Sequence, residues 1–311
     1  MKQMSSSDGA MGSVAVTRLR DSFRYGLMTC RFVVNWREAI SFVRHNLRLP
    51  SPRSSIDLRL RDGTVLHEVC DPRLVINVVA YCHYSRKIGC YSSRDLQVLY
   101  EVARSVTLRV KKPFSAKELA AYASGGAFWT KEVVLFALIR AFKPEVCVET
   151  GVAQGVSSYT MLEAISLNGH GKLISVDLPN RDPKGYKYSD GTVDHVYTPE
   201  KLTPGWLVPD RLHPRWDLRL GRSSSLLPEL KEPVDLFLHD SEHSYENMMF
   251  ELEWAYSQLR GNGIIASDDI HWNTAFSDFS RRHPDLKPLA PNPEFGILRS
   301  TGNGLKEKSV R

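Results

Sequence analysis

Residues 146–158 read VCVETGVAQGVSS, a short apolar strand that runs into Glu149, two glycines and the start of a helix. Gly151 and Gly155 let the backbone turn sharply and approach a ligand closely, because glycine has no Cβ. The helix that follows would point its free N–H groups at this loop. An acid precedes the glycines, which are four residues apart, so the loop differs from the dinucleotide fingerprint GxGxxG. Such an acid suits a cationic ligand better than a pyrophosphate.

A second acid ends the next predicted strand, LISVD at residues 173–177. Asp177 at this place can accept hydrogen bonds from both hydroxyls of a ribose. Together the loop and Asp177 indicate a nucleoside ligand that has no diphosphate at the loop. The residues alone leave open a plainer alternative, in which the glycine loop is an ordinary turn from strand to helix.

Helices and strands alternate outward from this stretch, starting at residue 115. We expect Gly261-Asn262-Gly263 to cap the helix that ends near residue 259. The irregular stretch 178–215 is either a lid over a binding site or a packed surface loop. The alternation predicts an α/β fold with a parallel sheet and helices on both faces. We expect helices at 129–142, 157–167, 223–230, 245–259 and 272–282, and strands at 146–148, 173–176, 216–220, 236–238, 264–266 and 295–298.

The first third of the chain has a different pattern. Residues 56–69, IDLRLRDGTVLHEV, alternate around Asp62-Gly63 and predict a hairpin, and residues 96–106 predict a helix. Residues 1–112 carry 19 Lys and Arg against 9 Asp and Glu, a net charge of +10, while the rest carry 22 against 26, a net charge of −4. We expect a flexible N-terminus at 1–20, a basic α+β region at 21–112, the main domain at 113–300 and a flexible tail at 301–311.

The composition excludes several classes of protein. The hydrophobic fraction of 42% and the charged fraction of 24% are those of a globular chain. We expect a cytoplasmic protein without a membrane segment, because there is no apolar run of 18 residues and no signal peptide pattern. The five cysteines form no CxxC pair, so neither a disulfide framework nor a zinc ribbon is expected. The basic first third suits an anionic partner or is a solvated positive surface.

The motifs VETGVAQGVSS, LISVD and LFLHDSEHSYENMMFELEWAYSQLRGNGIIASDDI resemble those of class I S-adenosylmethionine-dependent methyltransferases. The resemblance covers about residues 125–299 and is closest to the small-molecule and sugar O-methyltransferases. It implies a Rossmann-like sheet and S-adenosylmethionine as the cofactor, with Asp177 on the ribose and Arg222 and Ser223 near adenine. Arg222 departs from the family pattern, which often has an acid there. The residues that would border the methionine part are Glu149, Gly151, Gln154, Gly155, Ser157 and Asp240.

The class I strand order that the resemblance implies makes neighbours of two strands that end in acids, about 4.8 Å apart. Asp240, Asp268 and Asp269 would crowd one sheet edge, where a divalent cation such as Mg²⁺ would relieve their repulsion. Alternatively, Asp268 or Asp269 caps the next helix. His243 is a candidate base, and Glu242 or Asp240 could orient or replace it. The alternative for His243 is a local hydrogen bond at the start of a helix.

The function that we expect is O-methylation of a sugar-type or natural-product-type hydroxyl. Other hypotheses stay open: an RNA or nucleotide-linked substrate, although no RNA-binding module is recognisable, a non-catalytic protein that binds the cofactor, and hydroxylation on the same fold. A homo-oligomer is compatible with the sequence. The residues name neither the acceptor nor a metal.

Overall fold

The structure is a computed structural model that describes residues 58–59, 65–66, 81, 85, 88–90, 92–110, 130–179, 186–187, 193–194, 202–289 and 294–302. The chain divides into two compact units, one ending at Ser105 and the other beginning at Val106. The expected N-terminus at 1–20 and most of the tail at 301–311 lie outside the described residues. The proposed domain boundaries therefore stay predictions.

The first unit contains the predicted hairpin and most of one helix. Strands β1 (Leu58–Arg59) and β2 (Val65–Leu66) pair antiparallel, and Leu58 faces Leu66. The turn that joins them, with Asp62-Gly63, lies outside the described residues. Helix α4 (Ser93–Val110) is longer than predicted at both ends.

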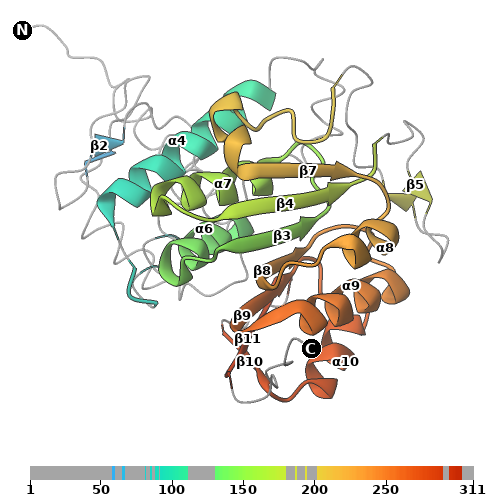
Figure 1. The fold of residues 1–311 in the computed structure, drawn as a ribbon. Coiled ribbons are helices and arrows are strands. Elements are labelled where there is room, and N and C mark those ends of the chain that lie inside the picture. The colour runs from blue at the N-terminus through green and yellow to red at the C-terminus, as the bar shows by residue number, and fades with distance from the viewer. Residues whose placement is uncertain are drawn as a thin grey trace, which may run out of the picture. The chain divides into compact units, whose positions relative to one another are not determined.

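The second unit is built on a sheet of seven strands in the order β10-β11-β9-β8-β3-β4-β7 (Figure 1). Strands β3, β4 and β7 lie side by side in parallel, and β8 and β9 extend the parallel part on the other side of β3. Each of the six predicted strands is present. The bounds are β3 (Val146–Thr150), β4 (Lys172–Asp177), β7 (Trp216–Leu220), β8 (Val234–His239), β9 (Leu259–Ser267), β10 (Leu286–Pro288) and β11 (Gly296–Ser300).

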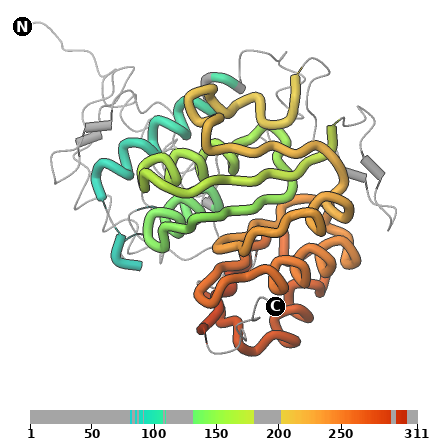
Figure 2. Tube along the Cα trace, in the orientation of Figure 1, coloured from blue at the N-terminus to red at the C-terminus, as the bar shows by residue number. Residues whose placement is uncertain are grey.

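One strand corrects the expectation of an all-parallel sheet. Strand β11 lies antiparallel to both β9 and β10. Strand β10 was not predicted, and it contains Pro288, which an edge strand tolerates because its outer N–H groups need no partner in the sheet. In Figure 2 the trace passes from the central green strands to a yellow-orange strand at one edge and then crosses to the orange and red strands at the other.

Helices cover both faces of the sheet, as predicted. Successive residues of β3, β4 and β8 are almost all buried, which requires cover on either side. On one side Val148, Val176 and Phe237 join a hydrophobic core with residues of α9 and α10. On the other side α6 packs along α7, which contacts β4. The bounds are α6 (Thr130–Phe142), α7 (Val156–Asn168), α9 (Tyr245–Gln258) and α10 (Ala275–Arg282).

The predicted glycine cap after α9 is wrong. The helix ends at Gln258, and the extended backbone of its C-cap Leu259 (ψ 133°) already starts β9. Gly261, Asn262 and Gly263 therefore lie within this strand, where the pairing with β8 is irregular between Val234 and Leu236. The sheet pairing determined the local structure here rather than the glycines.

The segments 223–230 and 178–215 also differ from the prediction in their secondary structure. The helix expected at 223–230 is one turn, α8 (Ser223–Leu226), followed by the 3-10 turn η2 (Leu227–Glu229), which contains Pro228. The irregular stretch 178–215 includes the strand pair β5 (Tyr186–Lys187) and β6 (Val193–Asp194) and the 3-10 helix η1 (Asp210–Arg215).

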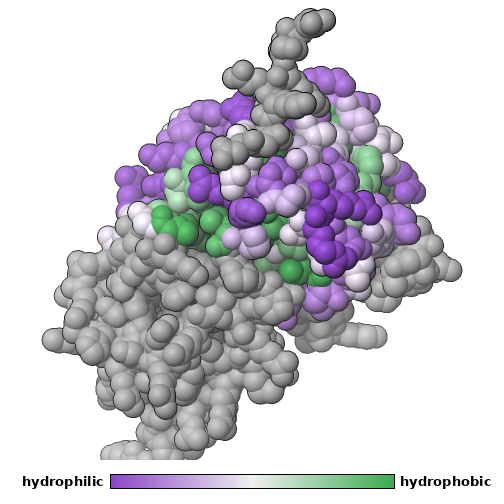
Figure 3. Space-filling model, turned by 90° about the horizontal axis from the view of Figure 1, so that it is seen from below, coloured by the Kyte–Doolittle hydropathy of each residue, from purple (hydrophilic) through white to green (hydrophobic). Residues whose placement is uncertain are grey.

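The surface of the described residues is mostly polar. On the face in Figure 3 the coloured surface is largely hydrophilic, with small hydrophobic areas between. Among these residues the exposed large hydrophobic side chains are Leu220 and Trp272. No helix in this part of the chain combines the length and apolar character needed to cross a membrane.

Candidate functional site

The glycine loop connects β3 to α7 with two left-handed glycines. Gly151 has φ +82°, and a Cβ there would lie 1.9 Å from the backbone oxygen of Asp240. Gly155 has φ +90°, and its Cβ would lie 2.8 Å from Cα of Gly205. Side chains at either position would therefore collide with backbone. Neighbouring segments of the protein therefore leave no room for a side chain at either glycine. From the sequence, the same two glycines had been attributed to the close approach of a ligand.

Glu149 lies at the base of the loop and is fully buried. Its carboxylate accepts hydrogen bonds from the hydroxyls of Ser157 (2.9 Å), Ser175 (2.6 Å) and Ser158. Burial raises the pKa of Glu149 above its ordinary value, although the three hydroxyls oppose this shift. The partners Ser158 and Ser175 were not anticipated. Glu149 on β3 thus links the start of α7 to β4. Its contact with a cofactor stays a prediction.

Asp177, at the end of β4, holds the loop from the side. One carboxylate oxygen accepts the backbone N–H groups of Val152 (3.1 Å) and Ala153 (2.8 Å), and the other accepts that of Leu178 (2.8 Å). These bonds fix the carboxylate beside the loop, and its contact with a ribose stays a prediction. Asp177 is therefore both a structural clamp and the predicted ribose acceptor.

A segment from the irregular stretch braces the outer side of the loop. The N–H of Gly205 donates to the carbonyl of Ala153 (2.8 Å), and the N–H of Leu207 donates to that of Gln154 (3.0 Å). Arg109 in turn donates to the carbonyls of Leu207 (2.6 Å) and Trp206 (3.1 Å). The predicted site residue Gln154 is buried, and its backbone carbonyl is bonded to this segment.

The predicted adenine contacts lie after β7. Arg222 is exposed and forms the N-cap of α8. The Ser223 hydroxyl lies 3.4 Å from the side-chain oxygen of Asn247, so it points toward α9. Their roles toward a cofactor stay predictions.

Asp240 and Asp268 are brought together at the ends of β8 and β9. The two strands are neighbours, as predicted, and pair His239 with Ser267 in the last register position. The unexpected partner is Lys131, in the first turn of α6. Its ammonium nitrogen lies 2.8 Å from Oδ2 of Asp240 and also bonds to Oδ2 of Asp268.

The three charged groups shift one another's pKa. Burial opposes the charge of Lys131, but Asp240 and Asp268 outweigh it and raise the pKa of the ammonium well above its ordinary value. Burial raises the pKa of Asp240 well above its usual range, and Asp268 adds to this while Lys131 opposes it. The pKa of Asp268 is lowered, because Lys131 outweighs the burial of this carboxylate. The repulsion expected between the acids is thus relieved by an amino group of the chain.

Asp269 points to another part of the site. Its backbone is left-handed (φ +49°), and its Oδ2 lies 4.0 Å from Nε2 of His243. Burial, followed by the charge of Asp268, raises the pKa of Asp269 to about 6. Within the described ranges, no three Asp, Glu, His or Cys side chains converge in a way that could hold a metal ion. The Mg²⁺ site at Asp240, Asp268 and Asp269 stays a prediction.

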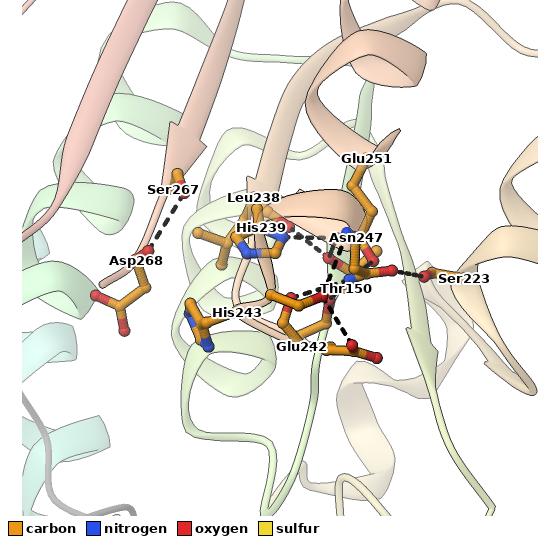
Figure 4. Close-up of polar contacts among 12 residues, drawn as sticks. Thr150, Ser223, Leu238, His239, Glu242, His243, Asn247, Glu251, Ser267 and Asp268 are labelled. Carbon is orange, nitrogen blue, oxygen red and sulfur yellow. Dashed lines mark hydrogen bonds and ion pairs between the residues drawn. The ribbon is translucent and has the colours of Figure 1, made fainter. Parts of the chain in front are cut away.

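His243 is largely buried and lies between Asp268 and a second polar cluster (Figure 4). Burial, with the neighbouring His239, lowers the pKa of His243 to about 3, so the imidazole is neutral at physiological pH. Its Nε2 has no hydrogen-bond partner among the described residues. Its ring centroid lies 5.1 Å from that of Trp272, whose side chain is 55% exposed. A neutral imidazole with a free nitrogen can accept a proton.

The second polar cluster was missed at the sequence level. His239 and Glu251 are both fully buried, and Nδ1 of His239 lies 2.6 Å from Oε2 of Glu251. Glu251 also accepts hydrogen bonds from Thr150 (2.5 Å), Ser241 (2.8 Å) and Asn247 (3.1 Å). Burial would raise the pKa of Glu251, but His239 and the hydrogen bonds lower it below its ordinary value. The signal in the sequence that could have found this cluster is Glu251, an acid on the buried, otherwise apolar face of α9.

Glu242, the third candidate base, lies at the start of α9. Its Oε1 accepts the hydroxyl of Ser244 (2.8 Å), and Ser244 is the N-cap that accepts the N–H of Asn247 (3.3 Å). Glu242 therefore supports the helix start, and a catalytic role for it stays a prediction.

Residues 148–270 match the family model of a methyltransferase domain. This segment carries the glycine loop, Asp177, Asp240, His243 and both late acids. A search of the curated proteins finds no match to the chain.

Two solved structures are similar to part of the chain at low sequence identity. A methyltransferase from Podospora anserina, solved with SAH, is 16% identical, with a TM-score of 0.44, and covers 65% of this chain and 87% of its own. A putative O-methyltransferase from Klebsiella pneumoniae is 15% identical, with a TM-score of 0.41, and covers 65% of this chain and 89% of its own. The segment 148–270, which carries the glycine loop and Asp177, is thus similar to a methyltransferase domain.

Proposed function

We propose that this domain binds S-adenosylmethionine at the glycine loop and transfers its methyl group to a hydroxyl of a small molecule. The loop, Asp177 and the start of α7 lie at the carboxyl ends of β3 and β4, where open α/β sheets bind ligands. The acids and His243 follow the neighbouring strands β8 and β9, so an acceptor at these residues would be next to the cofactor.

The residues of the loop fit such a cofactor. Asp177 is an acid at the end of β4, the place from which a carboxylate can accept hydrogen bonds from ribose hydroxyls. The hydroxyl of Ser157 donates to Glu149 and can still accept a hydrogen bond from an ammonium group. The first turn of α7 suits a carboxylate, because helix N-termini attract negative charge. Glycine, acid and hydroxyl groups therefore match the zwitterionic methionine end and the ribose of the cofactor.

The observation that carries the reaction type is the state of His243. Its pKa of about 3 leaves the imidazole neutral, and its Nε2 is free of hydrogen bonds from the described residues. A hydroxyl acceptor must lose a proton during methylation. Nε2 of His243 is unprotonated and could accept it, although a pKa of about 3 makes this imidazole a weak base. The half-exposed indole of Trp272 lies beside this ring and would contact the acceptor. His243 is preferred to Asp240 as the base on geometry alone, because Lys131 already engages Asp240.

The bond changes are those of an in-line displacement. The sulfonium of the cofactor supplies an activated methyl group, so the protein mainly aligns the two substrates and removes a proton. His243 accepts the hydroxyl proton, and the acceptor oxygen forms its bond to the methyl carbon as the carbon–sulfur bond breaks. The network of Glu251 and His239 lies behind His243 and keeps its surroundings fixed.

An acceptor screen with labelled S-adenosylmethionine tests this proposal. We expect label transfer to hydroxyl compounds of the sugar or natural-product type. His243→Gln should lose transfer and retain cofactor binding. Transfer to RNA, with a steep dependence on salt, would instead favour the nucleic-acid alternative. Cofactor binding with no transfer to any acceptor would favour a regulatory protein.

A further inference from the structure

Lys131 lies at a position that disfavours a positive charge unless acidic partners compensate it. It lies in the first turn of α6 (Thr130–Phe142), where the helix dipole disfavours positive charge. Its side chain is only 16% exposed, so water stabilises the ammonium poorly. The ammonium is held by two acids from different strands, Asp240 after β8 and Asp268 after β9. Such a costly arrangement indicates a role for the charge at this point.

The ammonium also sits at the point where a bridging cation would bind. It contacts Oδ2 of Asp240 and Oδ2 of Asp268 at the same time. The third acid, Asp269, is aimed at His243 instead. Lys131 thus satisfies the two facing carboxylates, which would otherwise repel each other. A divalent ion at these oxygens would have to displace the ammonium.

The ammonium keeps one donor for a substrate. An ammonium group has three N–H donors, and two of them bond to Asp240 and Asp268. The third is without a hydrogen-bond acceptor among the described residues. A donor from a positive group stabilises an oxygen that becomes negative during a reaction.

We propose that Lys131 is the built-in cation of this site: it positions Asp240 and Asp268 and donates its third N–H to the acceptor oxygen, so that methyl transfer needs no divalent metal ion. This inference rests on the proposed function. As His243 takes the hydroxyl proton, Lys131 stabilises the negative charge on the oxygen and keeps its own proton. The oxygen then bonds to the methyl carbon, and the electrons of the carbon–sulfur bond remain on sulfur.

The first test measures metal binding and needs no substrate. The paramagnetic ion Mn²⁺ is titrated into the full-length protein and followed by electron paramagnetic resonance. We expect the wild type to leave Mn²⁺ free at about 1 mM, the weak end of oxygen-ligand sites. The control Lys172→Met, which removes an exposed partner of Glu232, should behave in the same way. Micromolar Mn²⁺ binding by the wild type that Asp268→Asn abolishes would overturn the proposal.

The second test measures turnover in the presence of EDTA. The wild type should keep its kcat, whereas Lys131→Met should lose about 100-fold in kcat, as after removal of a donor to a developing oxyanion. The double variant Lys131→Met/Asp268→Asn removes one charge of each sign. It should recover the thermal stability of the wild type but not its kcat. Loss of activity in EDTA with recovery in Mg²⁺, or full kcat in a Lys131 variant, would overturn the proposal.

Cofactor binding separates this inference from the proposed function. Each Lys131 variant should still bind S-adenosylhomocysteine, because Lys131 bonds to Asp240 at the edge of the predicted cofactor site, whereas Glu149 and Ser157 bond to each other at the glycine loop. If the wild type does not bind S-adenosylhomocysteine, the proposed function fails. The Mn²⁺ titration still decides whether Lys131 excludes a metal ion.

Discussion

The buried pair of Glu251 and His239 offers a sharp test of how the site is held. Replacing Glu251 by Gln keeps the size of the side chain but removes its charge and turns one oxygen into a donor. Each carboxylate oxygen of Glu251 faces two hydrogen-bond donors. Thr150 and His239 lie at Oε2, and Ser241 and Asn247 lie at Oε1. Whichever way the amide faces, its NH₂ group meets at least one donor.

The expected loss of stability is large, because one partner of a buried pair is removed. Such changes cost about 3–5 kcal/mol. The matched control is Glu253→Gln on the same helix, which breaks a half-exposed pair with His283 (2.9 Å). Pairs of this kind are worth about 0–1 kcal/mol. Urea unfolding followed by tryptophan fluorescence measures both variants. Equal free energies of unfolding for the two would refute the reasoning.

The effect also depends on pH, with a defined sign. The pKa of Glu251 is lowered in the folded protein, so folding favours the ionised carboxylate. Its contribution is fully present above the unfolded pKa of about 4.3 and is lost as the pH falls through the lower folded value. The gap in stability between wild type and Glu251→Gln should therefore shrink only in acid. A gap that instead grows below about pH 4.3 would contradict this assignment.

Three further predictions concern the loop and the base. Gly151→Ala should destabilise the protein by more than the roughly 1–2 kcal/mol that a left-handed backbone costs, because the new Cβ meets the backbone of Asp240. The control Gly169→Ala has open space around its Cβ and should cost only that amount. Equal unfolding free energies for the two variants would contradict this. His243→Gln should lower kcat by about 10²–10⁴-fold with unchanged cofactor affinity, and retained turnover would remove His243 as the base. Because the pKa of His243 is about 3, the wild-type kcat should show no rise between pH 5 and 8 from this group, and a rise that His243→Gln removes would refute that protonation state.

The sequence predicted the fold well where periodicity and chain order decide it. The alternation of strands and helices predicted every strand of the sheet except β10. The adjacency of Asp240 and Asp268 was predicted from the strand order of the family that the sequence resembles. The reversed direction of β11 and the loss of the glycine cap after α9 depend on pairing between strands, which local residue preferences do not contain.

The site was predicted less completely, because its partners come from distant parts of the chain. Lys131 lies 109 residues before Asp240, and nothing in the local sequence links them. Thr150, Asn247 and Glu251 meet only once β3, β8 and α9 are packed. The one local clue was a lysine in the first turn of α6, where a cation is disfavoured.

Calorimetric titration with S-adenosylhomocysteine tests the central claim most directly. The account predicts one binding site per chain in the wild type. It also predicts an affinity loss of about 1.5–3 kcal/mol in Asp177→Asn, which replaces a charged acceptor by a neutral one. Asp217→Asn, an exposed acid on the neighbouring strand β7, is the matched control and should bind like the wild type. No binding by folded wild type, or equal affinity in wild type and folded Asp177→Asn, would contradict the assignment of the glycine loop and Asp177 as the cofactor site.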